Sequence, residues 1–538
     1  MKYYVTADVH GFYTILHDAV EEAGFFAETQ PHKLIILGDL FDRGTEAPEL
    51  QEFILKLMEE GRVILVKGNH EDLFEEMLTE DAGLPYHHHV SNGTYMTALQ
   101  LTGYEPTMAR LLIIQTNMKK TFTTLLLALT AMMTWAQTSA LELLKADPKR
   151  SFGTDYPYHF TDAKLTASPA GYEPFYIAHY SRHGSRYFWS DFLYKGLDSL
   201  MTKAHERHQL TAEGEAFYNK FTAAKQELFT GWSELTQLGW EQHQGIARTM
   251  YNNFPEVFSK GGNVLAVSSL VGRCVISMSA FCQELVQCNP MIEIRENSSR
   301  FTLHAVVPDD RQNPLRRKYP RSKPRFEQNR AQFKQENPLP QTVVARVFTN
   351  TDSLPEASRI YYLLSNLYTS LPNIGHEGMM GNILTDEEIA SQWEASNLGT
   401  YAWVFGPRYE TIPILEDILE KADAVVKGES DHIADLRFGH DSYLGPLTVL
   451  MGINGADRDP EDPYEVKNCY QNWETCMASN IQLVFYRSQE NSDILVKCLL
   501  NGEEATLPVP TVMAPYYKWS DFRDFYTARC QSVQPLNP

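Results

Sequence analysis

Residues 175–186 read Phe-Tyr-Ile-Ala-His-Tyr-Ser-Arg-His-Gly-Ser-Arg, an apolar run that leads directly into basic side chains. The apolar and aromatic residues of Phe175–Tyr180 predict a buried strand. Arg182, His183 and Arg186 follow at the end of that strand. Because open α/β sheets bind ligands beyond the carboxyl ends of their strands, this stretch predicts both a sheet and a binding site.

The polar side chains of this stretch suit a phosphoryl group. Two guanidinium groups can hold phosphate oxygens through paired hydrogen bonds, and an imidazole between them can attack phosphorus in line. Gly184 has no Cβ and lets the backbone approach a ligand closely. The alternative for an isolated histidine between two arginines is an exposed basic turn.

Two later stretches repeat the pattern of a strand followed by polar residues. Leu265–Ser269 is a β-type run, and Arg273 follows it at the start of a helix-like segment. Leu436–Gly439 is followed directly by His440 and Asp441. Together with His183 these residues supply a nucleophile, cations and an acid, which are the groups that a covalent phosphomonoesterase needs.

These residues resemble the clade-2 histidine phosphatases, the histidine acid phosphatase family that contains phytases, multiple inositol polyphosphate phosphatases and acid glucose-1-phosphatases. The similarity spans about residues 150–535 and includes Leu235–Gly239 with Gln242 and His243. It implies that His183 forms a phosphohistidine and that Asp441 protonates the leaving group. It also implies that no metal or other cofactor is required and that the phosphate is held by Arg182, Arg186, Arg273 and His440.

The same resemblance implies an α/β fold with a phosphoglycerate-mutase-like core. In such a core a mixed, mainly parallel sheet carries helices on both faces, and a helical cap domain is inserted into it. We expect the histidine phosphatase domain to span residues 141–538, with its core over about 150–199, 258–291 and 402–538 and its cap over about 200–257 and 292–401. Residues 480–486 and 493–499 predict a pair of antiparallel strands near an edge.

Two positions depart from common forms of this family. Phe188 stands where proline is usual, which we expect to affect the rigidity of the loop rather than its chemistry. His440-Asp441-Ser442 replaces the His-Ala-Glu that multiple inositol polyphosphate phosphatases typically carry and matches the form shared by phytases and general acid phosphatases. An inositol polyphosphate such as phytate is the expected substrate, with a sugar phosphate as the alternative.

The first hundred residues carry a second set of polar groups at strand ends. The pattern of short β-rich runs and one helix-like segment predicts β-α-β-α-β. The polar groups at the strand ends are Asp8-Val9-His10, a segment from Gly38 to Gly44, and Gly68-Asn69-His70-Glu71. Carboxylate, imidazole and amide oxygen ligands suit two divalent metal ions that activate a water molecule.

This region resembles the calcineurin-like metallophosphoesterases of the serine/threonine protein phosphatase type. The resemblance implies a phosphate contact at Arg43, a leaving-group acid at His70 and metal ligands at Asp8, His10, Asp39 and Asn69. The family also supplies two later histidines from a second sheet, whereas the match fades after about Gly103. We therefore expect residues 1–107 to be a truncated, inactive α/β fragment, and two divalent metal ions only if the fragment is competent.

Residues 108–140 form a junction with a signal-peptide-like segment at 118–136. Two lysines precede an apolar run, and Thr134 and Ala136 are small enough for cleavage after Ala136. As a helix the 16-residue apolar run would be about 24 Å long, which is short for a hydrocarbon core of about 30 Å. A signal peptide predicts a periplasmic or secreted product that starts at Met118; a buried helix and a membrane anchor are the alternatives.

Charge and cysteine usage also divide the chain. The net charge is −21, from 47 basic and 68 acidic side chains, which argues against a general nucleic-acid binder. Residues 1–110 carry 19 acidic and 7 basic side chains, whereas all seven cysteines lie from Cys274 onward. Residues 311–334 are rich in Lys and Arg, and either line the cleft or form a solvated surface segment.

These observations predict an exported acid phosphomonoesterase that acts through phosphohistidine on a small phosphorylated molecule. We expect it to bind no nucleic acid. We also expect the chain to have no stable membrane span. The first alternative is a general acid sugar-phosphatase of the same family. The others are a metal-dependent phosphoesterase or protein phosphatase that uses the N-terminal motifs, and a non-catalytic phosphate-binding surface protein.

Overall fold

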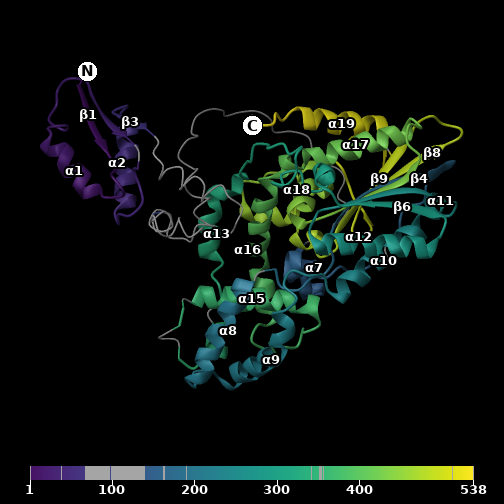
Figure 1. Cartoon of the computed structure of the whole chain (residues 1–538), viewed down its shortest axis with the longest axis horizontal. Helices are drawn as coiled ribbons and strands as arrows, with labels where there is room; N and C mark the ends of the chain where they lie inside the picture. The colour runs from purple at the N-terminus through teal and green to yellow at the C-terminus, as the bar shows by residue number, and fades with distance from the viewer. Residues whose placement is uncertain are drawn as a thin grey trace. The chain divides into compact units, whose positions relative to one another are not determined.

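The computed structural model consists of two compact units, Met1–Met133 and Thr134–Pro538. Asn69, His70 and the signal-peptide-like segment 118–136 lie outside the residues that the structure describes. Those described residues are 2–37, 39–66, 97, 140–161, 164–189, 191–340, 342–350, 354–355, 357–511 and 513–536 (Figure 1).

The N-terminal unit contains the predicted β-α-β-α-β segment. Its parallel strands are β1 (Lys2–Ala7), β2 (His32–Leu37) and β3 (Val63–Val66), in that spatial order. The helices are α1 (Tyr13–Glu22) and α2 (Ala47–Glu59), and their apolar residues share one cluster with strand residues. Alternate strand residues, such as Tyr3, Val5 and Ile64, are exposed. Among the described residues, therefore, one face of this sheet is left largely uncovered.

The second unit is built on one eight-stranded sheet. The strand order is β10-β9-β8-β4-β7-β5-β6, with β11 paired to β9, and the four strands β4, β7, β5 and β6 are parallel. The strands are β4 (Tyr172–Arg182), β5 (Gly262–Ser268), β6 (Ile292–Asn297), β7 (His432–Gly439), β8 (Asn480–Ser488), β9 (Leu495–Leu500), β10 (Glu503–Glu504) and β11 (Tyr516–Lys518). The mixed, mainly parallel sheet and the antiparallel β8–β9 pair are confirmed.

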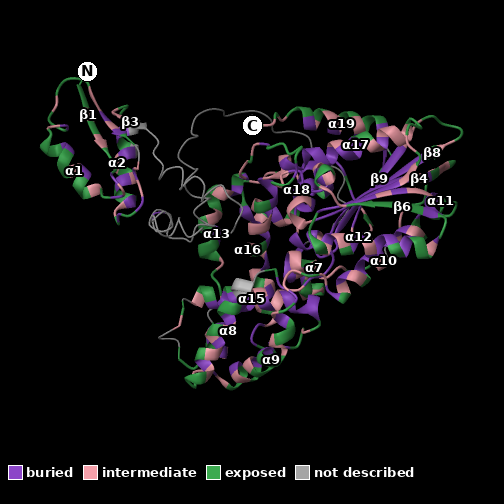
Figure 2. Ribbon diagram, in the orientation of Figure 1, coloured by how far each residue is buried: buried purple, intermediate pink, exposed green. Residues whose placement is uncertain are grey.

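Helices cover both faces of this sheet (Figure 1). One face packs against α17 (Ile412–Val426), α18 (Asp441–Met451) and α19 (Trp519–Gln531). The other packs against α10 (Gln237–Asn253), α11 (Pro255–Phe258) and α12 (Gly272–Cys288). Figure 2 shows β4, β8 and β9 between these layers as largely buried, and β4 is accordingly a mostly apolar run rather than an alternating pattern. In β7 apolar residues alternate with Asp435 and Arg437, which are buried as well.

A mostly helical region packs beside the sheet around a hydrophobic cluster of its own. That cluster includes Leu197, Phe217 and Leu364 and extends to residues on α7 and α16. The remaining helices of the unit are α7 (Ala140–Ala146), α8 (Asp191–Glu206), α9 (Ala212–Leu228), α13 (Arg330–Glu336), α14 (Thr342–Val347), α15 (Ala357–Ser370) and α16 (Asp386–Phe405).

The predicted limits of the cap differ from the structure, and two segments show this clearly. Residues 237–257 belong to the sheet layer, because Ile246 and Met250 of α10 share a cluster with strand residues such as Val264. Residues 292–297 form β6, which pairs with β5. A helical apolar stripe does not reveal its packing partner, and the charged residues of β6 are those of an exposed edge strand.

Two further features bear on the sequence expectations. All seven cysteines are unpaired thiols, and six of them are buried. Among the helices that the structure describes, none is long and apolar enough to cross a membrane.

Candidate active site

His183 directly follows the central strand β4, whose neighbours in the sheet are β7 and β8. Its backbone N–H donates to the carbonyl oxygen of Gly439 at 3.0 Å, which ties it to the end of β7. Its ring Nδ1 lies 2.9 Å from the carbonyl oxygen of Gly184. A carbonyl only accepts, so Nδ1 carries the proton and Nε2 keeps its lone pair.

The pKa of His183 is held well below its usual value. Burial is the main cause, and the positive charges of Arg273 and Arg182 add to it. The imidazole is therefore neutral, which is the form that can attack an electrophile.

The loop after His183 is held by contacts that the sequence did not reveal. A Cβ on Gly184 would lie 2.3 Å from the carbonyl oxygen of Gly239, so α10 packs directly on the loop backbone. The Ser185 N–H donates to Gln242 Oε1 at 2.8 Å, and the Ser185 hydroxyl donates to Asn373 Oδ1 at 2.7 Å. Asn373 is some 190 residues away and has no local signal. Gln242 was identified only as part of a similar segment.

Arg182 is buried and already has polar partners. Its Nη1 donates to the carbonyl oxygen of Thr475 at 2.9 Å, and its Nη2 lies 3.2 Å from Asp441 Oδ2. Arg186 forms an ion pair with Asp155 at 3.6 Å. Arg182 therefore links the end of β4 to the carboxylate that the sequence places after β7.

Arg273 lies in the first turn of α12, next to His440. Its Nη2 is 3.4 Å from His440 Nδ1, and its Nη1 donates to Ser233 Oγ at 2.7 Å. Since arginine can only donate, His440 Nδ1 is the acceptor and the proton of the neutral ring is on Nε2. That Nε2 lies 3.1 Å from Ser269 Oγ.

His440 and Asp441 complete the cluster. The His183 and His440 rings lie edge to face with centroids 5.5 Å apart. Burial, with the charge of Arg273, lowers the pKa of His440 to about 3. Burial alone would raise the pKa of Asp441, but the charges of Arg182 and Arg186 outweigh it and hold that pKa below its usual value. In the absence of a ligand, Asp441 is therefore a carboxylate.

The structure thus brings all six predicted residues of the second unit to one end of the sheet. The basic segment 311–334 is not part of this cluster in the contacts that the structure shows. Several of its arginines form ion pairs with acidic residues instead. These pairs are Arg317 with Glu416, Arg321 with Glu410, and Arg325 with Glu461. The contacts favour a structural role for the segment over the lining of a cleft.

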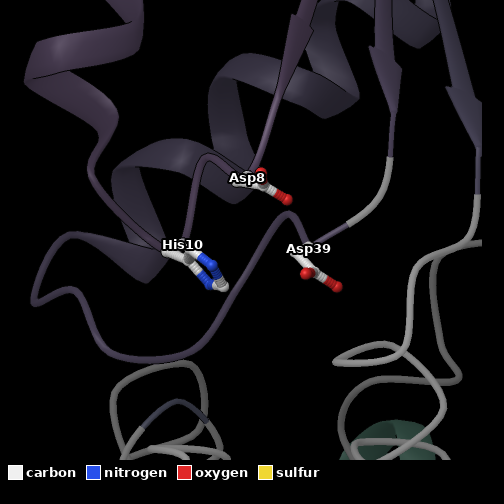
Figure 3. Close-up of side chains that lie close together, drawn as sticks. All are labelled: Asp8, His10 and Asp39. Atoms are coloured by element: carbon white, nitrogen blue, oxygen red, sulfur yellow. The ribbon is translucent and has the colours of Figure 1, made fainter.

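The N-terminal unit assembles three of its four predicted metal ligands. Ligand atoms of Asp8, His10 and Asp39 all lie within 4.8 Å of one another (Figure 3). His10 Nδ1 is 3.4 Å from the carbonyl oxygen of Phe41, a contact that helps to orient the ring. All three residues have positive φ, as do Asp42 and Arg43, a concentration of backbone strain that is typical of functional sites. The donor set therefore fits a divalent metal ion, and Asn69 and His70 lie outside the described residues.

A family model matches the N-terminal part of the chain. The calcineurin-like phosphoesterase family matches residues 1–127, which extends beyond the predicted limit at 107. A bis(5'-nucleosyl)-tetraphosphatase of Bacillus velezensis is 32% identical over 76 residues, or 13% of this chain. The chain spans 30% of the length of that curated relative.

Comparisons by structure match the larger part of the chain. The multiple inositol polyphosphate phosphatase of Bifidobacterium longum, in complex with inositol hexasulfate, superposes with a TM-score of 0.53 and 18% identity. The match covers 69% of this chain and 96% of that chain. The phytase from D. castellii gives a TM-score of 0.52 and 15% identity over 72% of this chain and 86% of its own. This likeness shows the histidine phosphatase fold.

Proposed function

We propose that the second unit, which contains the expected histidine phosphatase domain 141–538, is an acid phosphomonoesterase that works through a phosphohistidine. The observation that carries this proposal is the state of His183, a buried neutral imidazole whose Nδ1 proton is held by Gly184. Its Nε2 attacks phosphorus, and the alkoxide leaves as it takes a proton from Asp441. Water then displaces the phosphate from Nε2 and gives a proton to the Asp441 carboxylate, which restores the acid and the neutral imidazole.

In this proposal Arg182, Arg186 and Arg273 balance the charge on the phosphate oxygens, and neutral His440 donates its Nε2–H to the phosphate in place of Ser269 Oγ. The reaction uses no metal or other cofactor in this unit. The three guanidinium groups already act on His183 and Asp441 in the ligand-free protein. A cationic cluster of this kind favours a phosphate monoester over a neutral molecule.

We propose inositol polyphosphates such as phytate as the substrate class, with sugar phosphates as the alternative within the same chemistry. The fold shared with an inositol polyphosphate phosphatase and a phytase supports the first. The His440-Asp441-Ser442 sequence is compatible with either. Export to the periplasm or medium follows if the segment 118–136 acts as a signal peptide.

The test of the proposal is phosphate release after metal removal. Treatment with EDTA is expected to leave the rate of phosphate release from phytate unchanged, because the proposed reaction at His183 uses no metal ion. Among the described residues, the groups that could hold a metal ion lie in the N-terminal unit. The rates of phosphate release from phytate and from glucose 1-phosphate, measured at equal concentration, show which of the two substrate classes is preferred. Loss of activity on chelation, restored by a divalent metal, would contradict the proposal and favour the N-terminal site.

Asp441 is the proposed proton donor to the leaving group. Bound phosphate adds negative charge beside Arg182 and Arg186, so the pKa of Asp441, held low in the free protein, rises in the complex. We expect kcat to fall as pH rises through that raised pKa. Asp441→Asn cannot donate a proton and should slow phytate hydrolysis about 10²–10⁴-fold.

The leaving group provides the control for this variant. p-Nitrophenolate leaves without protonation, so Asp441→Asn should slow the release of p-nitrophenol from p-nitrophenyl phosphate far less than phytate hydrolysis. Equal losses with both substrates would show that Asp441 acts in binding rather than as the acid.

A second candidate function belongs to the N-terminal unit. The clustering of Asp8, His10 and Asp39 supports the binding of a divalent metal ion, which would activate water for attack on a phosphoester. We infer metal binding there but no independent hydrolysis, since one sheet face remains exposed among the described residues.

A further inference from the structure

The segment between α9 and α10 pairs with the loop that carries the proposed nucleophile. Arg186 and Leu235 form an antiparallel bridge. Backbone hydrogen bonds flank it, from Thr236 N–H to Ser185 O at 2.9 Å, from Tyr187 N–H to Glu234 O at 2.9 Å and from Ser233 N–H to Phe188 O at 2.8 Å. The nucleophile loop is thereby joined to the end of a cap helix.

Ser233 lies at the end of this pairing and contacts a third element. Its hydroxyl oxygen accepts a hydrogen bond from Arg273 Nη1 at 2.7 Å, and its carbonyl oxygen is 3.4 Å from the same nitrogen. Its φ is 63°, a left-handed conformation that is costly for a residue with a Cβ. This conformation directs both oxygens to one guanidinium nitrogen.

The rest of the Arg273 guanidinium lies next to His440, another residue proposed to hold the phosphate. Nη2 is next to His440, and Nε is buried with no hydrogen-bond partner among the described residues. Ser233 therefore uses Nη1 and leaves the Nε–Nη2 edge, the edge that binds two oxygens of one phosphate. A long side chain fixed in this way loses less conformational entropy when it binds a ligand.

We propose that Ser233 is a positioning residue that holds Arg273 in its phosphate-binding orientation and couples it to the nucleophile loop. This inference rests on the proposed function, because it assigns the Nε–Nη2 edge of Arg273 to the phosphate. The role is distinct from that of Arg182, whose guanidinium is held by backbone carbonyls and Asp441.

Ser233→Gly separates positioning from folding. Glycine adopts φ near 63° without cost, and the substitution keeps the backbone hydrogen bonds and removes only the side chain. A purely structural serine would therefore be replaced by glycine with no loss. Ser233→Asn is the conservative variant, because asparagine tolerates the left-handed region and its amide oxygen can accept from Arg273.

The experiment measures binding of inorganic phosphate by calorimetry, and kcat and KM with p-nitrophenyl phosphate, on the full chain. We expect Ser233→Gly to weaken phosphate binding and to lower kcat/KM about tenfold, the loss expected for one hydrogen bond to a charged group. The urea midpoint should stay the same or rise. Ser233→Asn should recover most of the affinity. His208→Gly, which relieves a similar positive φ in the cap, should change neither affinity nor kcat/KM.

Two outcomes would overturn this role while leaving the proposed function intact. Unchanged phosphate affinity in Ser233→Gly would make Ser233 structural, and tighter binding would show that its hydroxyl competes with phosphate for Arg273. A wild-type chain that neither binds phosphate nor hydrolyses the ester would instead overturn the proposed function, and the inference with it.

Discussion

Replacement of His183 by alanine is expected to reduce phosphate release from phytate by about 1,000-fold or more, because the variant has no atom that can form the covalent intermediate. The residual rate would come from the cationic cluster alone. Steady-state assays at acidic pH measure the loss. Among the described residues the His183 ring hydrogen-bonds to the carbonyl oxygen of the adjacent Gly184, a local contact, so circular dichroism should show an unchanged fold.

Two other histidine substitutions make this result specific. His205→Ala changes a half-exposed cap histidine that pairs with Glu215, and it should leave the rate unchanged. His10→Ala removes a candidate metal ligand from the N-terminal unit. If His10→Ala abolished phosphate release and His183→Ala did not, the reaction would belong to the N-terminal unit and the proposal would be wrong.

Acid is expected to destabilise the ligand-free protein well above the pH at which carboxylates titrate. His179 on β4 and His243 on α10 are buried, and neither ring nitrogen of either residue has a hydrogen-bond partner among the described residues. Burial lowers the pKa of His243 to about 3 and holds the pKa of His179 well below its usual value. The folded protein therefore keeps both rings neutral.

The direction of the pH dependence follows from these lowered values. The unfolded chain takes up protons on both histidines below about pH 6.5, whereas the folded chain does not. Stability is therefore complete above that pH and falls as the pH decreases, by about 2 kcal/mol per histidine at pH 5. His304 and His432, whose pKa values are raised mainly by hydrogen bonds to Asp417 and Asp435, partly offset this loss.

Urea unfolding at pH 7.5 and pH 5 measures the effect. His243→Leu removes one titrating ring from an apolar site beside Phe438, so it should reduce the difference in unfolding free energy between the two pH values by about 2 kcal/mol. The exposed His159→Leu should leave the difference as in the wild type. A wild-type unfolding free energy that is the same at both pH values would show that the buried rings accept protons in the folded state.

Much of the sheet and the polar ends of its strands could be predicted because those signals are local. His183 and His440 directly follow β4 and β7, and parallel strands bring their carboxyl ends to one edge. The same reasoning placed Asp8, His10 and Asp39 together, and their ligand atoms lie within 4.8 Å of one another. The limits of the cap could not be predicted, because an amphipathic helix such as α10 packs equally well on a sheet or on other helices.

The sequence by itself determined which chemical groups the chain carries and at which strand ends they lie. The spacing of apolar residues and the polar residues that end each run are properties of neighbouring positions. Only the tertiary structure decided how those groups are held. Asn373 beside Ser185, and Ser233 beneath Arg273, come from segments that carry no motif. Burial is likewise a property of the packed fold, and it is burial that keeps His183 neutral while nearby guanidinium groups keep Asp441 charged.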